Sequence, residues 1–270
     1  MKREVFILVF AFYFIPAYGG FEQTGTGART AALGGAFVGL ADDVWAIHSN
    51  PAGLSRSSDR TLSFYYSPQP FGLSELRLYS FVGVLPTSLG TFGGSVTMYG
   101  YELYKETSFT FGYGSTISGL LWGGALNYRT VSIRNYGSAG TFVFDVGILA
   151  SLLPFLSVGI TAKNINAATI GEVREKLPQS FSLGVSYSPV ESATLLLDYQ
   201  KELGFPASPR AGFEYWIISE LAIRGGATDE PAEYSGGIGL RYSVFGIDYA
   251  IVTHQDLGLT HSFSLSIVGF

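Results

Sequence analysis

Charged side chains in this chain recur at alternate positions of segments whose other positions are apolar. Successive side chains of a β-strand point to opposite faces, so the charges share one face and the apolar side chains share the other. Charges of both signs on one face can form ion pairs that hold strands together, or can guide the polar group of a substrate. The sequence leaves both alternatives open. The candidate residues are Arg77, Arg129, Asp145, Lys163, Asp198, Arg210, Glu214, Arg224, Arg241 and Asp248.

Residues typical of catalysis are few. His48-Ser49-Asn50 resembles part of the His-x-Ser-Asn-Gly motif of outer-membrane phospholipases, but the residue between His and Ser is missing and Pro51 replaces the glycine. His254 and His261 are too few for a metal site without a further ligand. The chain has no cysteine, which excludes disulfides, thiolate metal sites and a lipid-modified cysteine. No Gly-x-Ser-x-Gly, Walker or dinucleotide motif occurs, so we expect no enzymatic activity and no cofactor.

The alternating segments predict strands that position these charges, and Phe181 to Tyr187 (Phe-Ser-Leu-Gly-Val-Ser-Tyr) shows the pattern clearly. Each segment has about 8 to 14 residues, and a tilted strand needs roughly 9 to 11 to cross a bilayer. An even number of strands is typical of bacterial barrels with both ends in the periplasm. About fourteen candidates lie near 60–67, 74–85, 90–101, 105–116, 120–133, 140–151, 155–165, 179–189, 192–201, 207–217, 219–228, 233–243, 245–254 and 259–270.

Composition indicates a membrane as the surroundings of this sheet. Charged residues make up 14% of the chain, well below the roughly 25% of soluble domains. Beyond the first twenty residues, no run of eighteen uncharged apolar residues could form a membrane helix. An Arg or Lys facing lipid at the midplane of a bilayer costs about 2 to 4 kcal/mol, and the strand charges occupy the less apolar face. We therefore predict an all-β fold, a transmembrane antiparallel β-barrel of about fourteen strands, with these charges in the lumen.

The connections and strand ends agree with this arrangement. Short connections, such as Ile117-Ser118-Gly119, alternate with longer polar ones, such as Asn164 to Pro178, as do periplasmic turns and external loops. Aromatic residues near strand ends indicate interface girdles: Tyr128, Tyr187, Tyr199, Trp216 and Tyr242. The terminal Phe270 is typical of recognition by the barrel-assembly machinery. Its parity differs from that of Phe263 and Leu265, which predicts a bulge near Val268-Gly269.

The amino terminus predicts export. A basic start (Met1-Lys2-Arg3) precedes an apolar run from Val5 to Ile15, and Ala17-Tyr18-Gly19 supplies the small residues that signal peptidase recognises. Residues 1–19 are predicted to be a signal peptide cut near Gly19 or Gly20. The alternative is a short membrane anchor. The signal places the mature protein in the bacterial outer membrane.

Residues 20–59 break the strand pattern and precede the barrel of residues 60–270. An Ala-rich stretch around Thr30 to Leu33 suits a short helix, and Asp42-Asp43 could cap a second one that runs through Ile47. In Asn50-Pro51-Ala52-Gly53-Leu54 we expect Asn50 as N-cap, Pro51 at the first helical position and Gly53 as the stop. A segment without strand pattern or disordered composition must pack somewhere, and the barrel lumen is the available space.

This segment resembles a known family. Gly27-Ala28-Arg29, Leu33-Gly34-Gly35-Ala36-Phe37, Ala41-Asp42-Asp43 and Asn50 to Leu54 occur in the order and spacing of the amino-terminal signature of PorV/PorQ proteins and, more loosely, of FadL-type fatty acid transporters. The FadL resemblance implies a hatch that plugs a fourteen-stranded barrel and that hydrophobic ligands pass. It implies that Asp42, Asp43, Asn50, Pro51 and Gly53 anchor the hatch, with polar contacts to barrel arginines. The PorV/PorQ resemblance implies a part in type IX protein secretion and surface attachment.

Three functions stay open. They are a plugged channel for small hydrophobic or amphipathic molecules, a component or shuttle of protein secretion, and a structural barrel without transport. The expected partners are outer-membrane lipid, hydrophobic small molecules or secretion-system proteins, and the assembly machinery through Phe270. The net charge of −5 gives no reason to expect nucleic acid.

Overall fold

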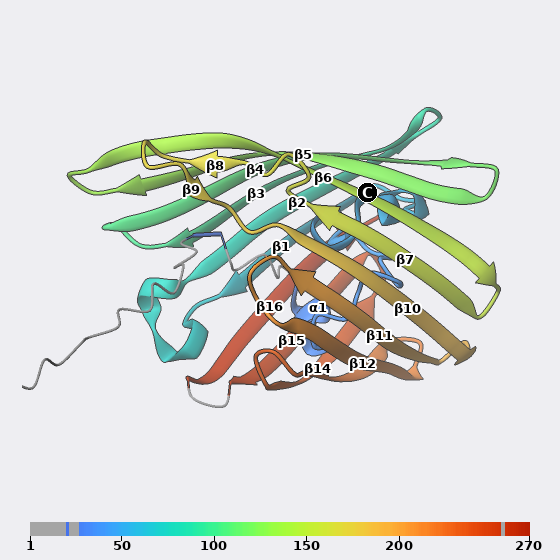
Figure 1. Ribbon diagram of the computed structural model, residues 1–270. Helices are drawn as coiled ribbons and strands as arrows, with labels where there is room; N and C mark the ends of the chain where they lie inside the picture. The colour runs from blue at the N-terminus through green and yellow to red at the C-terminus, as the bar shows by residue number, and fades with distance from the viewer. Residues whose placement is uncertain (1–19, 22–26, 255–256) are drawn as a thin grey trace, which may run out of the picture.

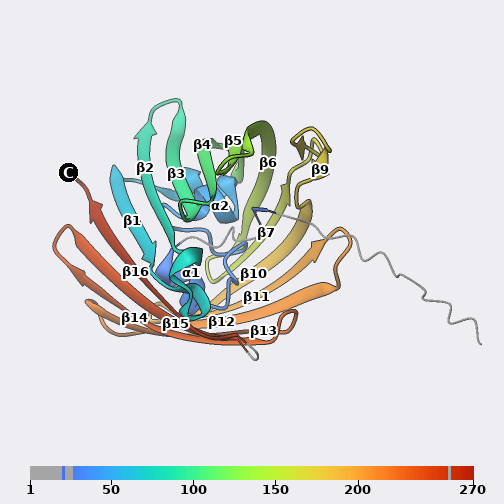
Figure 2. The same cartoon turned by 90° about the vertical axis from the view of Figure 1, so that its left-hand side faces the viewer.

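The computed structural model describes residues 20–21, 27–254 and 257–270, so the predicted signal segment 1–19 lies outside the described residues. Fourteen strands of the described chain form a closed antiparallel barrel, which β1 and β16 close by pairing Thr61 with Val268 and Tyr66 with Phe263 (Figure 1, Figure 2). Every predicted strand is present. Their bounds are β1 Thr61–Ser67, β2 Leu78–Thr87, β3 Gly90–Gly100, β4 Tyr104–Ile117, β5 Leu120–Ile133, β6 Gly137–Leu153, β7 Leu156–Lys163, β10 Ser180–Val190, β11 Ala193–Glu202, β12 Ala207–Ile218, β13 Leu221–Thr228, β14 Glu233–Tyr242, β15 Phe245–His254 and β16 Gly258–Val268.

The two ends of the barrel differ in their connections, as predicted. One end, the turn end, carries the two-residue turns 88–89, 118–119, 154–155, 191–192, 219–220 and 243–244. Ser118 and Gly119 both have positive φ, which the tight hairpin turns that match strand twist require. The opposite end, the loop end, carries the short helices η2 Pro70–Gly72 and η3 Ser74–Leu76 and the small hairpin of β8 Thr169–Ile170 and β9 Glu175–Lys176. In Figure 1 the loop end lies to the left.

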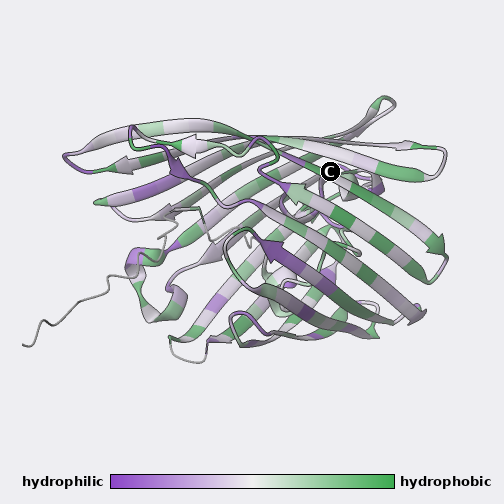
Figure 3. Ribbon diagram, in the orientation of Figure 1, coloured by the Kyte–Doolittle hydropathy of each residue, from purple (hydrophilic) through white to green (hydrophobic). Residues whose placement is uncertain are grey.

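The outer face of the barrel is apolar and exposed. Leu197 is 64% exposed, Phe111 56% and Ile247 51%, which no stable water-soluble sheet would leave uncovered on this scale. Figure 3 shows the apolar residues in bands along the strands. The prediction of a transmembrane barrel with its apolar parity outward is confirmed. No helix within the described residues is long and apolar enough to cross a membrane.

Residues 27–59 form the hatch, which lies inside the barrel (Figure 2). It contains the helices α1 Ala28–Ala32 and α2 Ala46–Ser49 and the 3-10 helix η1 Pro51–Arg56. Helix α1 packs against β13 to β16 and η1 against β3 to β6, so the hatch reaches both walls. The core of the molecule is therefore in the lumen, and the hatch supplies its largest fully buried apolar side chains: Trp45, Phe37, Leu33, Ile47 and Leu54.

Three local predictions need correction. Gly53 does not end a helix, because η1 continues to Arg56. Trp216 does not belong to an interface girdle: its Nε1 donates to Glu214 Oε1 over 3.3 Å on the lumen face of β12. The register of β16 shows no bulge at Val268, since the strand simply ends there and Gly269 takes a left-handed conformation with φ +73°. Phe270, 59% exposed, follows this turn.

Candidate functional site

A belt of glycines on the lumen wall receives the hatch. On eight strands from β3 to β13, a Cβ added to one lumen-facing glycine would come 3.0 Å or closer to a hatch atom. At Gly147 it would lie 2.0 Å from Asn50 Oδ1, and at Gly159 2.1 Å from the Val38 carbonyl oxygen. Only glycine permits so close an approach of two backbones. The belt consists of Gly93, Gly112, Gly123, Gly147, Gly159, Gly184, Gly212 and Gly226.

Asn50 ties the hatch to this wall, as its predicted role as an anchor requires. Its Nδ2 donates to the carbonyls of Val38 (3.0 Å) and of Ile148 on β6 (3.1 Å). Its Oδ1 accepts from Ala52 N, which makes it the predicted N-cap of η1, and the residue is fully buried. Pro51 is buried at the first position of η1. One side chain thus closes a turn inside the hatch and joins the hatch to the barrel.

Gly53 also contributes, although differently from the prediction. A Cβ on Gly53 would lie 2.0 Å from the carbonyl oxygen of Ala41, so η1 packs directly on the preceding segment of the hatch. The glycine is therefore required for the internal packing of the hatch and not for helix termination.

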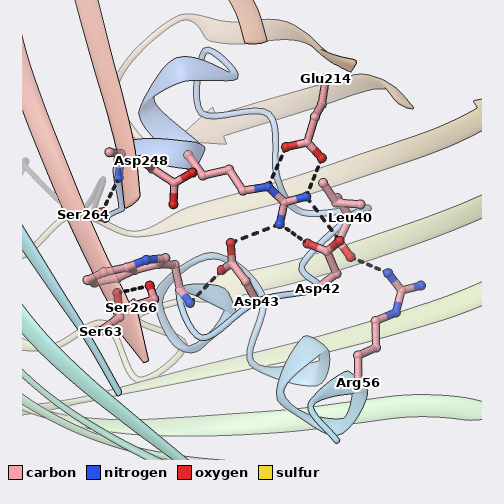
Figure 4. A network of polar contacts seen from close by, with 12 residues as sticks. Leu40, Asp42, Asp43, Arg56, Ser63, Glu214, Asp248, Ser264 and Ser266 are labelled. Carbon is pink, nitrogen blue, oxygen red and sulfur yellow. Dashed lines mark hydrogen bonds and ion pairs between the residues drawn. The ribbon is translucent and has the colours of Figure 1, made fainter. Parts of the chain in front are cut away.

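Asp42 and Asp43 converge on a hatch arginine and not on a barrel arginine, which corrects the prediction. Arg29 Nη1 lies 2.6 Å from Asp42 Oδ1 and 3.1 Å from Asp43 Oδ2 (Figure 4). The barrel contributes a carboxylate to this contact instead of an arginine: Arg29 Nε and Nη2 each donate to Glu214 of β12 over 2.8 Å. Arg29 is 5% exposed, and one buried cation therefore joins the hatch to the wall.

The Arg29 cluster extends into the barrel wall. Arg224 Nε binds Glu214 Oε2 at 2.6 Å, and Arg224 Nη1 binds Asp248 Oδ1 at 2.6 Å. Burial raises the pKa of Asp43 to about 6, and the neighbouring Arg29 opposes part of that rise. Six charged side chains and their hydrogen bonds thus form one network between the hatch and strands β12, β13 and β15.

Other wall charges hold the backbone of the hatch or one another. Asp198 Oδ2 on β11 accepts from the backbone N–H groups of Phe37 and Val38, both over 2.8 Å. At the turn end, Arg241 lies 4.2 Å from the ring centroid of Trp216. For these residues the ion-pairing and anchoring alternative agrees with the contacts.

Arg77 is not a lumen residue, which contradicts the prediction. It lies exposed between η3 and β2, and its Nε donates to the Ser74 carbonyl over 3.1 Å. The reason is that β2 begins at Leu78, four residues later than predicted.

A small pocket lies in the lumen on the loop-end side of the hatch. Its volume of about 50 Å³ leaves room for about one or two water molecules. The lining combines cations, carboxylates, neutral polar groups and rings: Phe21, His48, Thr97, Tyr99, Glu106, Ser108, Asn127, Arg129, Asp145 and Lys163. Three predicted lumen charges, Arg129, Asp145 and Lys163, thus meet in one place. We call this space the lumen pocket.

Phe21 lines the lumen pocket and joins it to the β8–β9 hairpin region. Its ring lies 5.4 Å below Arg129 Cζ, and its backbone N–H donates to Glu106 Oε2 over 2.8 Å. It packs with Val143 of β6 and with three buried residues of the β8–β9 hairpin region: Ala168, Ile170 and Leu177. This hairpin region, residues 164–178, covers the pocket from the loop end.

Asn164 fixes the base of the covering hairpin. The residue is fully buried, its Nδ2 donates to the Leu177 carbonyl over 3.1 Å, and its Oδ1 accepts from Ala168 N over 2.8 Å. Its own N–H donates to Asp145 Oδ1 over 2.8 Å. Sequence reasoning missed Glu106 and Asn164 because they lie where strand alternation begins or stops, and it missed Phe21 because this residue lies outside any strand pattern.

His48 lines the lumen pocket without a catalytic arrangement. Burial lowers its pKa to about 3, and the charges of Lys163 and Arg129 lower it further, so the imidazole is neutral at physiological pH. Among the described residues, no group of three or more His, Cys, Asp or Glu side chains could hold a metal ion.

Comparisons with known proteins bear on the fold. No protein-family model matches the chain, and no curated protein matches its sequence. Among solved structures, the toluene transporter TbuX of Ralstonia pickettii superposes with a TM-score of 0.68 at 13% identity, over 92% of this chain and 98% of TbuX. The fold is that of a FadL-like barrel.

Two further solved structures of FadL-like barrels agree. A FadL homologue of Pseudomonas aeruginosa gives a TM-score of 0.62 at 13% identity over 91% of this chain and 98% of that one. The toluene transporter TodX of Pseudomonas putida gives 0.63 at 13% identity over 90% and 96%. TbuX and TodX are described as toluene transporters. None of the comparisons supports the PorV/PorQ resemblance, which stays a prediction.

Proposed function

We propose that the protein is an outer-membrane channel for small hydrophobic or amphipathic molecules, and that the lumen pocket is its binding site. The observation that carries the proposal is the contrast in how the lumen is closed. Toward the turn end it is filled by the hatch on its glycine belt. Toward the loop end, among the described residues, Phe21 packs with the hairpin region 164–178 beside the lumen pocket.

The chemistry of the lumen pocket suits an amphipathic solute. Phe21 and Tyr99 provide apolar surface in its lining, and Arg129 provides a cation beside the Phe21 ring. Pockets that combine apolar walls with a few fixed polar groups are typical of small-molecule sites. The matched neighbours TbuX and TodX, described as toluene transporters, support a hydrophobic solute.

The structure also suggests where a solute would leave the lumen. An apolar groove on the outer wall is lined by Phe111, Leu126, Phe144 and Ile165, and it shares Asp145 with the lumen pocket. Gly124 contributes no side chain to the wall at this point. We propose that solutes pass sideways here toward the bilayer, because the seated hatch blocks the axial path.

Uptake by proteoliposomes tests this proposal. Vesicles containing the protein should take up toluene or a medium-chain fatty acid faster than empty vesicles. Phe21→Ala should increase the rate, because it removes the occupant of the lumen pocket. Tyr136→Ala, which changes an 89% exposed loop residue, serves as the control and should leave the rate unchanged. Equal uptake by protein-containing and empty vesicles for both solutes would contradict a channel.

A PorV/PorQ-like role in secretion is the second candidate, and the amino-terminal signature around Leu33 to Phe37 and Asn50 to Leu54 favours it. Gentle extraction from the native membrane should then recover secreted or translocon proteins with the barrel. Recovery of the barrel with small amphipathic molecules alone would favour the channel. Recovery of neither would favour a structural barrel.

A further inference from the structure

Residues Gly20 and Phe21 lie inside the barrel against one carboxylate. Phe21 N donates to Glu106 Oε2 over 2.8 Å, and the Tyr104 hydroxyl donates to Glu106 Oε1 over 2.6 Å. A Cβ added to Gly20 would lie 3.2 Å from Glu106 Oε1 and 3.2 Å from the Tyr104 hydroxyl. Glu106 is only 5% exposed. Both first residues after the predicted cut therefore sit at a buried anionic group of β4.

The sequence in front of Gly20 indicates that this position becomes an amino terminus. Ala17 and Gly19 are the small residues at the two positions that signal peptidase reads. The peptidase adds water to the Gly19–Gly20 peptide bond, which leaves a carboxylate on Gly19 and an ammonium group on Gly20. A cut one residue later would instead turn the Phe21 nitrogen, already 2.8 Å from Glu106, into the ammonium group.

We propose that Glu106 and Tyr104 form a binding site for the protein's own processed amino terminus. The ligand class is a primary ammonium group. Its hydrogen bonds to a carboxylate are charge-assisted and roughly twice as strong as those of a neutral amide. The attraction between a buried carboxylate and a neighbouring cation also offsets part of the free-energy cost of removing the carboxylate from water.

The geometry at Gly20 fits such a site. An added Cβ would lie 3.2 Å from both the Glu106 Oε1 atom and the Tyr104 hydroxyl, so a residue with a side chain would crowd the Glu106 carboxylate. A terminus held here fixes Phe21 under Arg129 in the lumen pocket. The terminus site itself does not depend on transport.

Intact mass and amine acylation test the site on the exported protein purified in detergent. The mass should correspond to a chain that starts at Gly20 or Phe21. Acylation of the terminal amine by an N-hydroxysuccinimide ester near neutral pH should be about tenfold slower than in Glu106→Gln, because a buried and ion-paired amine stays protonated. Tyr104→Phe should give a smaller acceleration. Glu102→Gln, which changes an exposed loop carboxylate, should react like the unchanged protein.

Two results would overturn the proposal. One is a mature chain that retains residues 1–19. The other is an equal acylation rate in the unchanged protein and Glu106→Gln while both migrate as folded barrels on unheated gels. If Glu106→Gln fails to fold, the acylation rate of the terminal amine is measured in the unchanged protein before and after unfolding in hot detergent. An increase in this rate of less than about threefold on unfolding would contradict the site. These readouts do not measure uptake, so their failure would leave the proposed channel untouched.

Discussion

Toward the turn end, the hatch packs directly on the glycine belt of the barrel wall, whereas toward the loop end the described residues that close the lumen include Phe21 and the hairpin region 164–178. The belt region combines Gly147 and Gly159 with the fully buried Asn50 and the Arg29 network. The lumen pocket is instead lined by Phe21, which Ile170 contacts from behind, and it keeps an unfilled space of about 50 Å³. The proposed channel function therefore places the expected movement at the loop-end side.

The largest expected effect concerns the ionic contact of the hatch. Arg29→Met removes the cation that Asp42, Asp43 and Glu214 share. Breaking a buried ion pair costs about 3 to 5 kcal/mol, and we expect the lower end because Arg224 still compensates Glu214. The free energy of unfolding, followed by gel mobility against urea concentration, measures it.

Arg134→Met is the matched control for this substitution. Arg134 pairs with Glu102 at 3.6 Å, and its side chain is 59% exposed, so its loss should cost less than about 1 kcal/mol. Equal losses for the two arginines would show that the Arg29 network does not hold the hatch.

A single methyl group on the belt should have the next largest effect. Gly147→Ala places a Cβ 2.0 Å from Asn50 Oδ1, so the hatch or β6 must shift, and overpacking of this kind costs about 1 to 3 kcal/mol. Gly94→Ala is the control, because a Cβ there has no atom within 4 Å. The free energy of unfolding of both variants is measured with the same assay. Equal losses for Gly147→Ala and Gly94→Ala would mean that the hatch does not pack on the barrel wall.

A smaller effect should appear with pH. The folded-state pKa of Asp43 is raised to about 6, so the folded protein binds a proton that the unfolded chain has already released. The stability contributed by this group is fully present below about pH 4 and is lost as pH rises through 6. Asp43→Asn should remove this loss of stability between pH 4 and pH 8. Thermal midpoints of both proteins across pH 4 to 8 test it, and parallel curves would contradict it.

Much of the barrel could be predicted from the sequence because lipid imposes a simple rule on it. Every membrane strand must turn its apolar parity outward, so alternation around Phe181 to Tyr187 or at Phe111 identifies strands without knowledge of their partners. The position of the hatch could be predicted because residues 20–59 lack the strand pattern and the lumen is the space available to them. Asn50 and Pro51 could be assigned because capping depends on residues that are close in sequence.

The contacts of the site could not be predicted, because they join residues far apart in sequence. Arg29 and Glu214 are 185 residues apart, and Phe21 and Glu106 are 85 apart. Alternation assigns Gly147 to the lumen face and Gly94 to the outer face, but nothing local shows that a Cβ on Gly147 would meet Asn50. Arg77 was assigned to a strand because the sequence pattern did not separate the short helix η3, at whose end Arg77 lies, from strand β2.

Hydrogen exchange of the protein in lipid nanodiscs, read by mass spectrometry, tests most directly whether the hatch stays seated while the loop end moves. Peptides from residues 27–59 should exchange as slowly as those from the central barrel strands. Peptides from residues 164–178 should exchange at least about tenfold faster, and only these should change when toluene or a fatty acid is added. Rapid exchange across residues 27–59, or its appearance on addition of a solute, would show that the hatch leaves its belt and would contradict this account.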